Sequence, residues 1–227
     1  MHQDISKNYH EILAQISEAC ARVGRDPSLV RLVAVSKTVG AEEIAAAIAA
    51  GIGNFGENRT DQFRLRQEQF LEANWHFIGS IQTNKIKDIV GKAALIHSVS
   101  SERALVAIAR RAQFMDVTQR LLIEVNISGE ESKDGISPDQ LDGLLDRAAD
   151  LEGIEVRGLM TMAPQGDLRA ARVAFRGLRE LRDSFIASFG ASGRIRLQEL
   201  SMGMSEDFSL AVEEGATIVR VGRSIWL

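Results

Sequence analysis

Short β-rich runs alternate with helical runs along almost the whole chain, and this alternation limits the possible folds more than any other feature. Eight segments have the apolar and β-branched character of strands: 31–36, 53–57, 74–79, 95–99, 120–127, 155–162, 196–202 and 217–222. Helical patterns follow the first seven, at 41–50, 59–72, 83–91, 101–113, 137–150, 169–189 and 205–214. Strict strand–helix alternation is typical of parallel strands joined by crossover helices. We therefore expect an α/β protein, and eight such units in 227 residues favour a (β/α)8 TIM barrel.

A doubly wound sheet is the competing architecture. Such a sheet usually has about six strands and carries a glycine fingerprint directly after the first one. Here the corresponding turn, residues 36–43, reads SKTVGAEE and lacks that fingerprint. The barrel is therefore favoured, as a single domain that spans residues 1–227.

The last expected strand has no outer helix of its own, because only RSIWL follows it. An amphipathic helix at 4–23 opens the chain, and its apolar face consists of Ile5, Ile12, Ile16 and Ala19. Since that face needs burial, we expect this extra N-terminal helix to cover the barrel where the eighth outer helix is missing.

The composition excludes several classes of protein. A formal net charge of −4 does not suit a nucleic-acid binder, and the arginine-containing runs at 64–69 and 176–183 resemble solvated helix faces. No apolar run reaches the roughly 20 residues of a membrane span, and the polar first ten residues do not resemble a signal peptide. The single cysteine, Cys20, is typical of a reducing compartment. We expect a cytoplasmic protein without nucleic-acid, membrane or metal partners.

Polar residues gather at the carboxyl ends of the expected strands, where barrels of this kind carry their functional groups. Lys37 follows the first strand, and glycine-containing turns at 201–203 and 222–224 follow the seventh and eighth. Glycine lets the backbone approach an anion closely and donate its N–H groups to it. Because barrels commonly bind phosphate after strands seven and eight, these two turns predict a phosphate site.

Arg220 lies two residues before Gly222 and therefore shares its strand face. The first and eighth strands adjoin in a closed barrel, so Lys37 and Arg220 are expected in one pocket. A ligand with an aldehyde at one end and a phosphate at the other fits this pocket, since desolvation and a nearby cation favour the neutral amine that attacks an aldehyde. A Schiff-base aldolase acting on a sugar phosphate would use the same groups.

Several motifs, taken in order, resemble the pyridoxal phosphate homeostasis protein family over nearly the whole chain: VAVSKT, FGENR, WHFIGSIQTNK, GLMTM, LSMGMSEDF and VRVG. That family is similar to the barrel domain of bacterial alanine racemase, which is fold type III among pyridoxal phosphate proteins. The resemblance implies a TIM barrel like the N-terminal domain of alanine racemase, with pyridoxal 5′-phosphate as its cofactor.

The resemblance also implies roles for individual residues. Lys37 would form the internal aldimine, the covalent link to the cofactor aldehyde, and Arg220 would face the pyridine nitrogen. Lys133 matches a loop lysine implicated in handling the cofactor. Further cofactor-binding residues would be Asn58 and His76, which line the cofactor, and Ser201, Met202, Gly222 and Arg223, which surround the phosphate.

Other interpretations of these residues remain open. Asn58 could cap the helix that follows it, His76 could be a satisfied core histidine, and Lys133 could be solvated in its charged loop. The chain also departs from the family, with Ser80 where proline or histidine is more frequent and Arg223 where threonine is common. Arg223 would therefore bind phosphate through its backbone N–H or its guanidinium.

An arginine beside the pyridine nitrogen disfavours its protonation and weakens the ring as an electron sink. Racemisation also needs acid/base groups on both faces of the substrate carbon, and in alanine racemase the second is a tyrosine from another domain and subunit. The only tyrosine here, Tyr9, falls in the expected leading helix. We therefore expect a monomer or weak dimer that holds and buffers pyridoxal phosphate and supplies it to transient apo-enzyme recipients, without efficient catalysis. A weak amino-acid racemase is the alternative, and a Schiff-base aldolase is less favoured.

Overall fold

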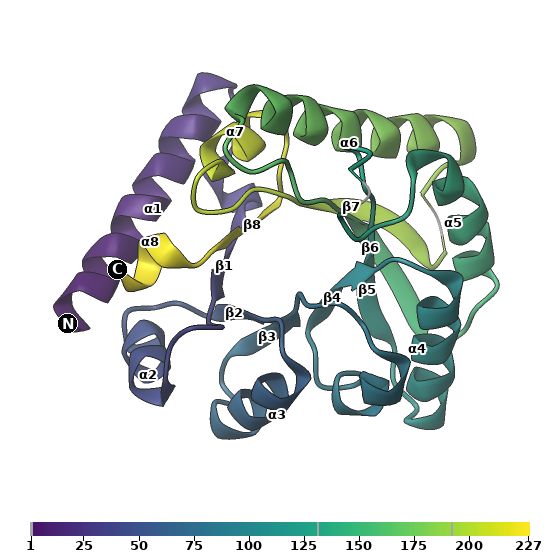
Figure 1. Cartoon of the computed structure of the whole chain (residues 1–227), viewed down its shortest axis with the longest axis horizontal. Helices are drawn as coiled ribbons and strands as arrows, with labels where there is room; N and C mark the ends of the chain where they lie inside the picture. Colours follow the sequence, from purple (N-terminus) through teal and green to yellow (C-terminus); the bar gives the residue numbers. More distant parts are fainter. Residues whose placement is uncertain (1, 131, 192) are drawn as a thin grey trace.

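Eight parallel strands form a closed barrel in the computed structural model of the chain, which describes residues 2–130, 132–191 and 193–227 (Figure 1). Each strand pairs with the next one in the sequence, and β8 closes the barrel against β1, with Arg220 opposite Val33. The strands are β1 Arg31–Val35, β2 Asn54–Glu57, β3 Asn74–Phe77, β4 Leu95–Val99, β5 Gln119–Glu124, β6 Ile154–Met160, β7 Ile195–Ser201 and β8 Ile218–Val221. The expected (β/α)8 barrel is confirmed.

Helices surround the barrel. The α-helices are α1 His2–Arg22, α2 Ala41–Ala49, α3 Thr60–Gln69, α4 Glu102–Phe114, α5 Leu141–Ala149, α6 Leu168–Phe189, α7 Phe208–Glu213 and α8 Arg223–Trp226. The described residues also form the 3₁₀ helices η1 Pro27–Leu29, η2 Thr83–Asp88 and η3 Pro138–Gln140. In the described part of the chain, none of the helices combines the length and the apolar character needed to cross a membrane.

The segment after β3 differs from expectation. The predicted helix at 83–91 is wrong, because only the six residues of η2 are helical and they adopt the tighter 3₁₀ form. Ile86, Ile89 and Val90 bury their side chains within this short segment. Gly91 then turns the chain toward β4 with a φ of 81°.

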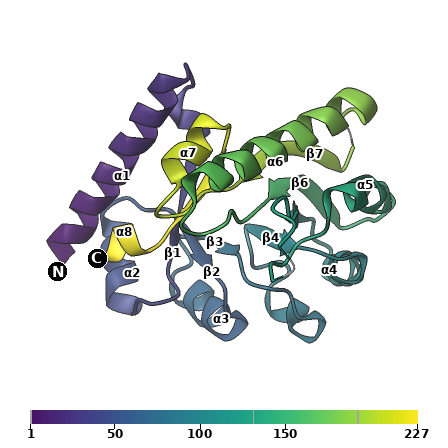
Figure 2. The same ribbon diagram turned by 45° about the horizontal axis from the view of Figure 1, so that its top comes forward.

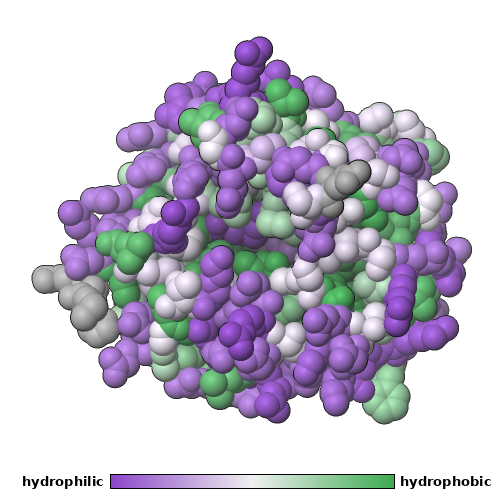
Figure 3. Space-filling view, in the orientation of Figure 1, coloured by the Kyte–Doolittle hydropathy of each residue, from purple (hydrophilic) through white to green (hydrophobic). Residues whose placement is uncertain are grey.

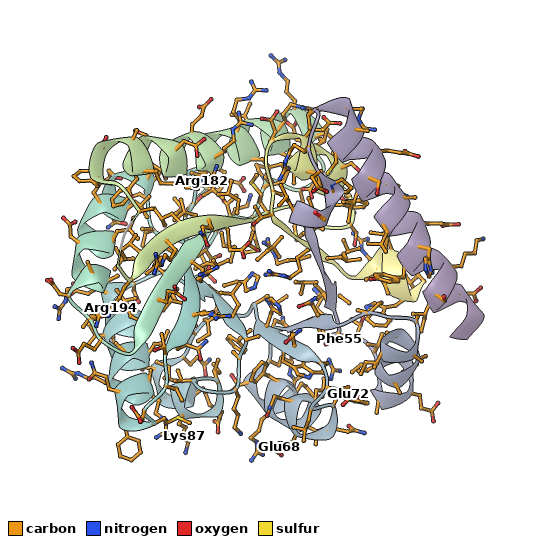
Figure 4. All side chains as sticks on the ribbon, turned by 180° about the vertical axis from the view of Figure 1, so that it is seen from behind. Phe55, Glu68, Glu72, Lys87, Arg182 and Arg194 are labelled. Atoms are coloured by element: carbon orange, nitrogen blue, oxygen red, sulfur yellow. The ribbon has the colours of Figure 1, made fainter. Side chains whose placement is uncertain are left out.

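Two layers of apolar side chains fill the molecule. The smaller layer takes one residue from each of five strands and therefore lies inside the barrel; it consists of Val33, Leu95, Leu122, Met160 and Ile218. The larger layer lies between the strands and the helices and includes the buried faces of α4 and α6. The view from behind shows side chains crowding the interior (Figure 4). At Gly158, an added Cβ would lie 1.8 Å from the carbonyl oxygen of Glu199, so the close approach of β6 and β7 requires glycine.

The helix α1 covers one side of the barrel, as expected. Its residues Ile12, Ile16 and Ala19 are at most 2% exposed, and it contacts α2, α7 and α8 (Figures 1 and 2). Asn8 Nδ2 donates a hydrogen bond to the carbonyl oxygen of Ile225 at 3.2 Å. Because α8 is a single turn of four residues, α1 supplies the outer cover that the eighth unit lacks.

The arginine-containing run at 176–183 is not simply solvated, which corrects the expectation from the sequence. Arg176 Nη2 on α6 donates to the Glu214 carboxylate at 2.9 Å, and Arg172 Nη1 donates to it at 3.1 Å. Arg179 Nη1 donates to the Glu214 carbonyl oxygen at 3.0 Å. These contacts join α6 to the end of α7, because helical spacing places the three arginines on one face.

Candidate functional site

A cavity of about 410 Å³ opens at the carboxyl ends of the strands, within the range of about 300–1,000 Å³ that small-molecule sites occupy. The end of β1, the loop between β6 and α6, the loop after β7 and the end of β8 line it. On this side the molecule is hollowed near its middle, with hydrophobic residues at the floor (Figure 3). Four residues predicted from the sequence line the cavity together: Lys37, Arg220, Gly222 and Arg223.

Lys37 combines a fixed backbone with a free amine. Arg66 of α3 donates to the carbonyl oxygens of Ser36 and Val39, both at 2.6 Å, on either side of the lysine. The same guanidinium forms an ion pair with Glu57 at the end of β2. Within the described parts of the chain, the Lys37 amine has neither a hydrogen bond nor an ion pair. The lysine side chain is therefore available to a ligand in the cavity.

Arg66 also corrects an expectation from the sequence. The run at 64–69 was predicted to be a solvated helix face, but Arg66 is only 7% exposed, whereas Arg64 is exposed. A buried guanidinium needs partners for its donors, and the carbonyl oxygens of the β1–α2 loop and the carboxylate of β2 provide them. The charged pattern of the run does not reveal which arginine turns inward.

Arg220 lies at the inner wall of the cavity and is 4% exposed. Its Nη1 donates to Ser201 Oγ at 2.6 Å, and its Nη2 donates to the carbonyl oxygen of Thr161 at 3.0 Å. Burial lowers the pKa of Arg220 to about 10, although Glu124 and Asp207 act in the opposite direction. Arg220 therefore remains a cation at neutral pH.

The loop after β7 meets the end of β8 at the other side of the cavity. The backbone N–H of Gly222 donates to Ser205 Oγ at 3.3 Å. The loop turns at Gly203, which has a φ of 93° and where an added Cβ would lie 2.5 Å from the Cβ of Ala211. Only glycine suits that position. The turn places a hydroxyl group beside a backbone amide, a combination that can bind a phosphate oxygen.

The three carboxylates that line the cavity already have partners. Asp167 accepts from the backbone N–H groups of Arg169 and Ala170 and so caps α6. Glu206 pairs with the Arg223 guanidinium at the exposed rim. Asp207 accepts from the backbone N–H of Met204 at 2.6 Å. These pairings leave Lys37 and Arg220 as the cations that an anionic ligand would meet.

Ser201 and Met202 do not line the cavity. Ser201 is fully buried, and its hydroxyl contacts Arg220 and His97 inside the barrel. The Met202 side chain is also fully buried, in the larger apolar layer between the strands and the helices. Residues 204–207, a few positions later in the same loop, line the cavity instead. The sequence analysis selected Ser201 and not Ser205, although the motif LSMGMSEDF contains both serines.

Asn58 and His76 also lie outside the cavity lining. Asn58 is exposed beyond the end of β2, and its backbone N–H donates to Glu57 Oε1 at 2.8 Å. His76 is 2% exposed inside the barrel, where its ring nitrogens contact His97 Nε2 at 2.9 Å and Asn54 Oδ1 at 3.3 Å. The interpretation of His76 as a satisfied core histidine agrees with these contacts.

Lys133 lies in the loop after β5 and does not line the cavity. Its amine pairs with Glu130 Oε1 at 3.0 Å, and its side chain is 17% exposed. The same loop is tied to the loop after β3, because Ser80 Oγ donates to Asp134 Oδ2 at 2.6 Å. Ser80, one of the departures from the family pattern, therefore joins two loops at the carboxyl end of the barrel.

Glu124 is a feature that sequence reasoning largely missed. It ends β5 and is 3% exposed, and its carboxyl group has no hydrogen-bond partner among the described residues. Burial, with Asp134 as a further cause, raises the pKa of Glu124 to about 7, and the charge of Arg220 opposes this shift. The signal available in the sequence was a glutamate directly after the apolar residues Leu121–Ile123 of this strand.

Proteins of known families resemble the chain over most of its length. The family model for the N-terminal domain of alanine racemase matches residues 8–227. A pyridoxal phosphate homeostasis protein of Aquifex aeolicus is 42% identical over 214 residues, which cover 93% of this chain and 92% of the relative. One from Deinococcus radiodurans is 42% identical over 218 residues, which cover 95% of this chain and 97% of the relative.

A solved structure extends the comparison. PipY of Synechococcus elongatus, determined with pyridoxal phosphate bound, matches with a TM-score of 0.82 and 33% identity, covering 93% of this chain and 100% of that one. The closed barrel, with its free lysine after β1 and its arginine on β8, is therefore of the alanine racemase N-terminal type. More narrowly, the chain belongs to the pyridoxal phosphate homeostasis protein family.

Proposed function

We propose that the chain binds pyridoxal 5′-phosphate in this cavity, buffers it and supplies it to apo-enzymes. The observation that carries the proposal is the unpaired Lys37 amine, in a cavity that also contains the buried cation Arg220 and the paired Ser205 and Gly222. The name of the Aquifex relative and the bound ligand of PipY support it. The proposal includes a cytoplasmic protein, monomeric or weakly dimeric, in agreement with the free thiol of Cys20.

The residues that line the cavity fit pyridoxal phosphate. Pyridoxal phosphate is an anion, and the carboxylates around the cavity are already capped or paired. The backbone N–H groups near Gly222, including that of Arg223, and the Ser205 hydroxyl would hold the phosphate. Arg220 has only donors and no acceptor, so it would donate to the ring nitrogen and keep that nitrogen unprotonated.

Bound pyridoxal phosphate would supply an aldehyde carbon that an amine can attack. Lys37 presents that amine, and Arg66 keeps the backbone around it in place. The cavity lining, within the described ranges, contains no histidine, tyrosine or cysteine that could act as a second acid or base. Tyr9, a residue of α1, packs against the larger apolar layer instead. These features favour holding the cofactor over racemising an amino acid, and we expect isotope exchange at the α-carbon of amino acids to stay slow.

The attachment residue provides the central test. Borohydride reduction of the loaded protein, followed by peptide mass spectrometry, should locate the cofactor on Lys37. The variant Lys37→Ala should lose the adduct, whereas Lys7→Ala, which alters an exposed lysine of α1, should keep it. Recovery of the cofactor on another lysine, with none at position 37, would contradict the proposal.

The phosphate provides a second test. Pyridoxal without its phosphate should bind at least about a hundredfold more weakly, because several charge-assisted hydrogen bonds of about 1.5–3 kcal/mol each are lost. Equilibrium titration of the two compounds measures this ratio. Equal affinities would mean that Ser205, Gly222 and Arg223 do not form the anion site.

A further inference from the structure

Five buried or half-buried polar side chains form one hydrogen-bonded row across the inside of the barrel, from β8 to β2. Arg220 Nη1 contacts Ser201 Oγ at 2.6 Å, and Ser201 Oγ contacts His97 Nδ1 at 2.8 Å. His97 Nε2 contacts His76 Nδ1 at 2.9 Å, and His76 Nε2 contacts Asn54 Oδ1 at 3.3 Å. We call these five residues the interior row. Arg220 lines the cavity, and His76 and Asn54 line a smaller polar opening of about 210 Å³.

Both histidines of the interior row are buried, which favours their neutral form, and with neutral rings the two ends determine the direction of every hydrogen bond in the row. A guanidinium only donates, and an amide oxygen only accepts. Ser201 therefore accepts from Arg220 and donates its own proton to His97 Nδ1. His97 then donates from Nε2 to His76 Nδ1, and His76 donates from Nε2 to Asn54. Both neutral imidazoles consequently carry their proton on Nε2.

The environment agrees with neutral histidines. Burial, together with the charge of Arg31, lowers the pKa of His76 to about 3. Burial also holds the pKa of His97 well below its ordinary value, and His76, Arg220 and Arg31 add to that effect. The row therefore contains one cation, Arg220, at neutral pH. Because a guanidinium does not release its proton there, the row orients groups and does not conduct protons.

His97 has a specific place in this arrangement. A serine hydroxyl rotates to suit its neighbours, and without an acceptor at His97 Nδ1 its proton would be free to point elsewhere. With that acceptor present, the Ser201 lone pairs face Arg220 Nη1, while the Thr161 carbonyl oxygen holds Nη2. Two anchors, one at each terminal nitrogen, set the plane of the guanidinium.

We propose that His97 is a positioning residue: it fixes the Ser201 hydroxyl and, through it, orients Arg220 toward the ring nitrogen of the bound cofactor. The proposal rests on the proposed function, because the ring is that of pyridoxal phosphate. His97 itself does not line the cavity and acts only through Ser201.

The first measurement needs no cofactor. Nitrogen-15 spectra of the unloaded protein should show the Nε2–H tautomer for both His76 and His97, without titration between about pH 5.5 and pH 9. The exposed His10 of α1 provides a solvent-accessible imidazole for comparison in the same spectra. A proton on His97 Nδ1, or a titration of His97 near its ordinary pKa, would overturn the proposal.

The second measurement separates positioning from general stability. In His97→Phe, affinity for pyridoxal phosphate should fall about tenfold, the value of one hydrogen bond involving a charged group. Affinity for the analogue with C–H in place of the ring nitrogen should change less than about twofold, because that analogue has nothing for Arg220 to contact. The variant His97→Asn, whose amide oxygen can still accept from Ser201, should recover most of the loss.

Controls and contrary outcomes complete the design. His10→Phe should leave both affinities unchanged. Equal losses for the cofactor and the analogue in His97→Phe, or no recovery in His97→Asn, would overturn the positioning role. If His97→Phe does not fold, the tautomer measurement and His97→Asn still decide. If the wild-type protein does not bind pyridoxal phosphate, the proposed function fails, and the spectra of the unloaded protein still show whether the interior row has the stated direction.

Discussion

At the scale of single residues, the barrel interior holds a cation and a carboxyl group in different ways. Arg220 has two hydrogen-bond partners, Ser201 and Thr161. Glu124 is equally buried but lacks such partners in the described structure, and its pKa rises to about 7. A buried carboxyl group without donors favours its neutral form. Glu124 therefore changes its charge within the range of pH at which proteins are handled.

This raised pKa predicts an unusual dependence of stability on pH. Between pH 4.5, the ordinary value, and about pH 7, the folded chain holds a proton on Glu124 that the unfolded chain has released. The contribution of Glu124 to stability is therefore full below pH 4.5 and declines as the pH rises through 7, by up to about 3 kcal/mol. Glu124→Gln removes the ionisation, so its gain in stability over wild type should be small at pH 5 and larger at pH 8.

Urea denaturation of the unloaded protein at pH 5 and pH 8 measures that gain. Glu11→Gln, on the exposed face of α1, is the matched control and should behave as wild type at both values. If the free energies of unfolding of Glu124→Gln and wild type differ by the same amount at pH 5 and pH 8, Glu124 does not ionise in the folded state within this range.

At the scale of elements, one arginine of α3 joins three segments around the candidate attachment residue. Arg66 contacts the carbonyl oxygens that flank Lys37 and pairs with Glu57 of β2. Glu57 in turn accepts from the backbone N–H groups of Asn58 and Arg59, at 2.8 and 3.1 Å. The loop after β1 is thereby attached to the start of α3.

Loss of Arg66 should act on both stability and attachment. Arg66→Met leaves the Glu57 carboxylate buried without its partner, which should cost about 3–5 kcal/mol. The double variant with Glu57→Gln should recover part of that stability and still attach pyridoxal phosphate to Lys37 more slowly than wild type, because the loop carbonyls remain unheld. Unfolding curves and the rate of adduct formation test this. Arg64→Met, at an exposed position, is the control; a wild-type attachment rate in the double variant would contradict the role of Arg66.

The contact between α6 and α7 gives a prediction with the opposite pH dependence. Burial alone would raise the pKa of Glu214, but hydrogen bonds from Arg176 and Arg172 outweigh it and hold the pKa below 4.5. The stabilisation by Glu214 is therefore present above pH 4.5 and lost as the pH falls through its lowered value. Glu214→Gln should cost about 1–3 kcal/mol at pH 7.

Denaturation at pH 7 and at about pH 3.5 tests the Glu214 contact, with the exposed Glu180→Gln of α6 as control. The loss of stability in Glu214→Gln relative to wild type should be smaller at the lower pH. Below pH 4.5 the unfolded wild-type chain takes up a proton on Glu214 that the folded chain does not, so the stabilisation from the lowered pKa declines. A deficit that is independent of pH would mean that packing, and not the charge, accounts for it.

At the scale of the whole molecule, the barrel depends on a helix from the opposite end of the sequence. The helix α1 packs on α7 and α8 and covers the side where the eighth unit has only one turn. Ile16→Ala should lower the free energy of unfolding by about 2–5 kcal/mol, because Ile16 is 2% exposed and its loss leaves a cavity. Urea denaturation measures the change, and Glu11→Ala on the exposed face of α1 should alter it little. A loss below about 1 kcal/mol for Ile16→Ala would show that α1 is not part of the cooperative unit.

Local patterns in the sequence determined the architecture and the cavity's main residues. Alternating strand and helix periodicity requires parallel strands, and parallel strands with crossover helices bring their carboxyl ends to one side. The positions of Lys37, Arg220 and Gly222 on that side follow from their places at strand ends. The burial of the Ile16 face of α1 follows from its amphipathic spacing.

Only the tertiary structure decided which polar side chains are buried and what they contact. His97 and Ser201 are 104 positions apart, and Arg66 looks in sequence like its exposed neighbour Arg64. Helical periodicity places a residue on a face, but the charge, hydrogen-bond partners and pKa of that residue depend on groups that the closing barrel brings near it from other strands. For the same reason, the sequence selected Ser201 for the phosphate, whereas the fold turns its hydroxyl inward and brings Ser205 to the cavity.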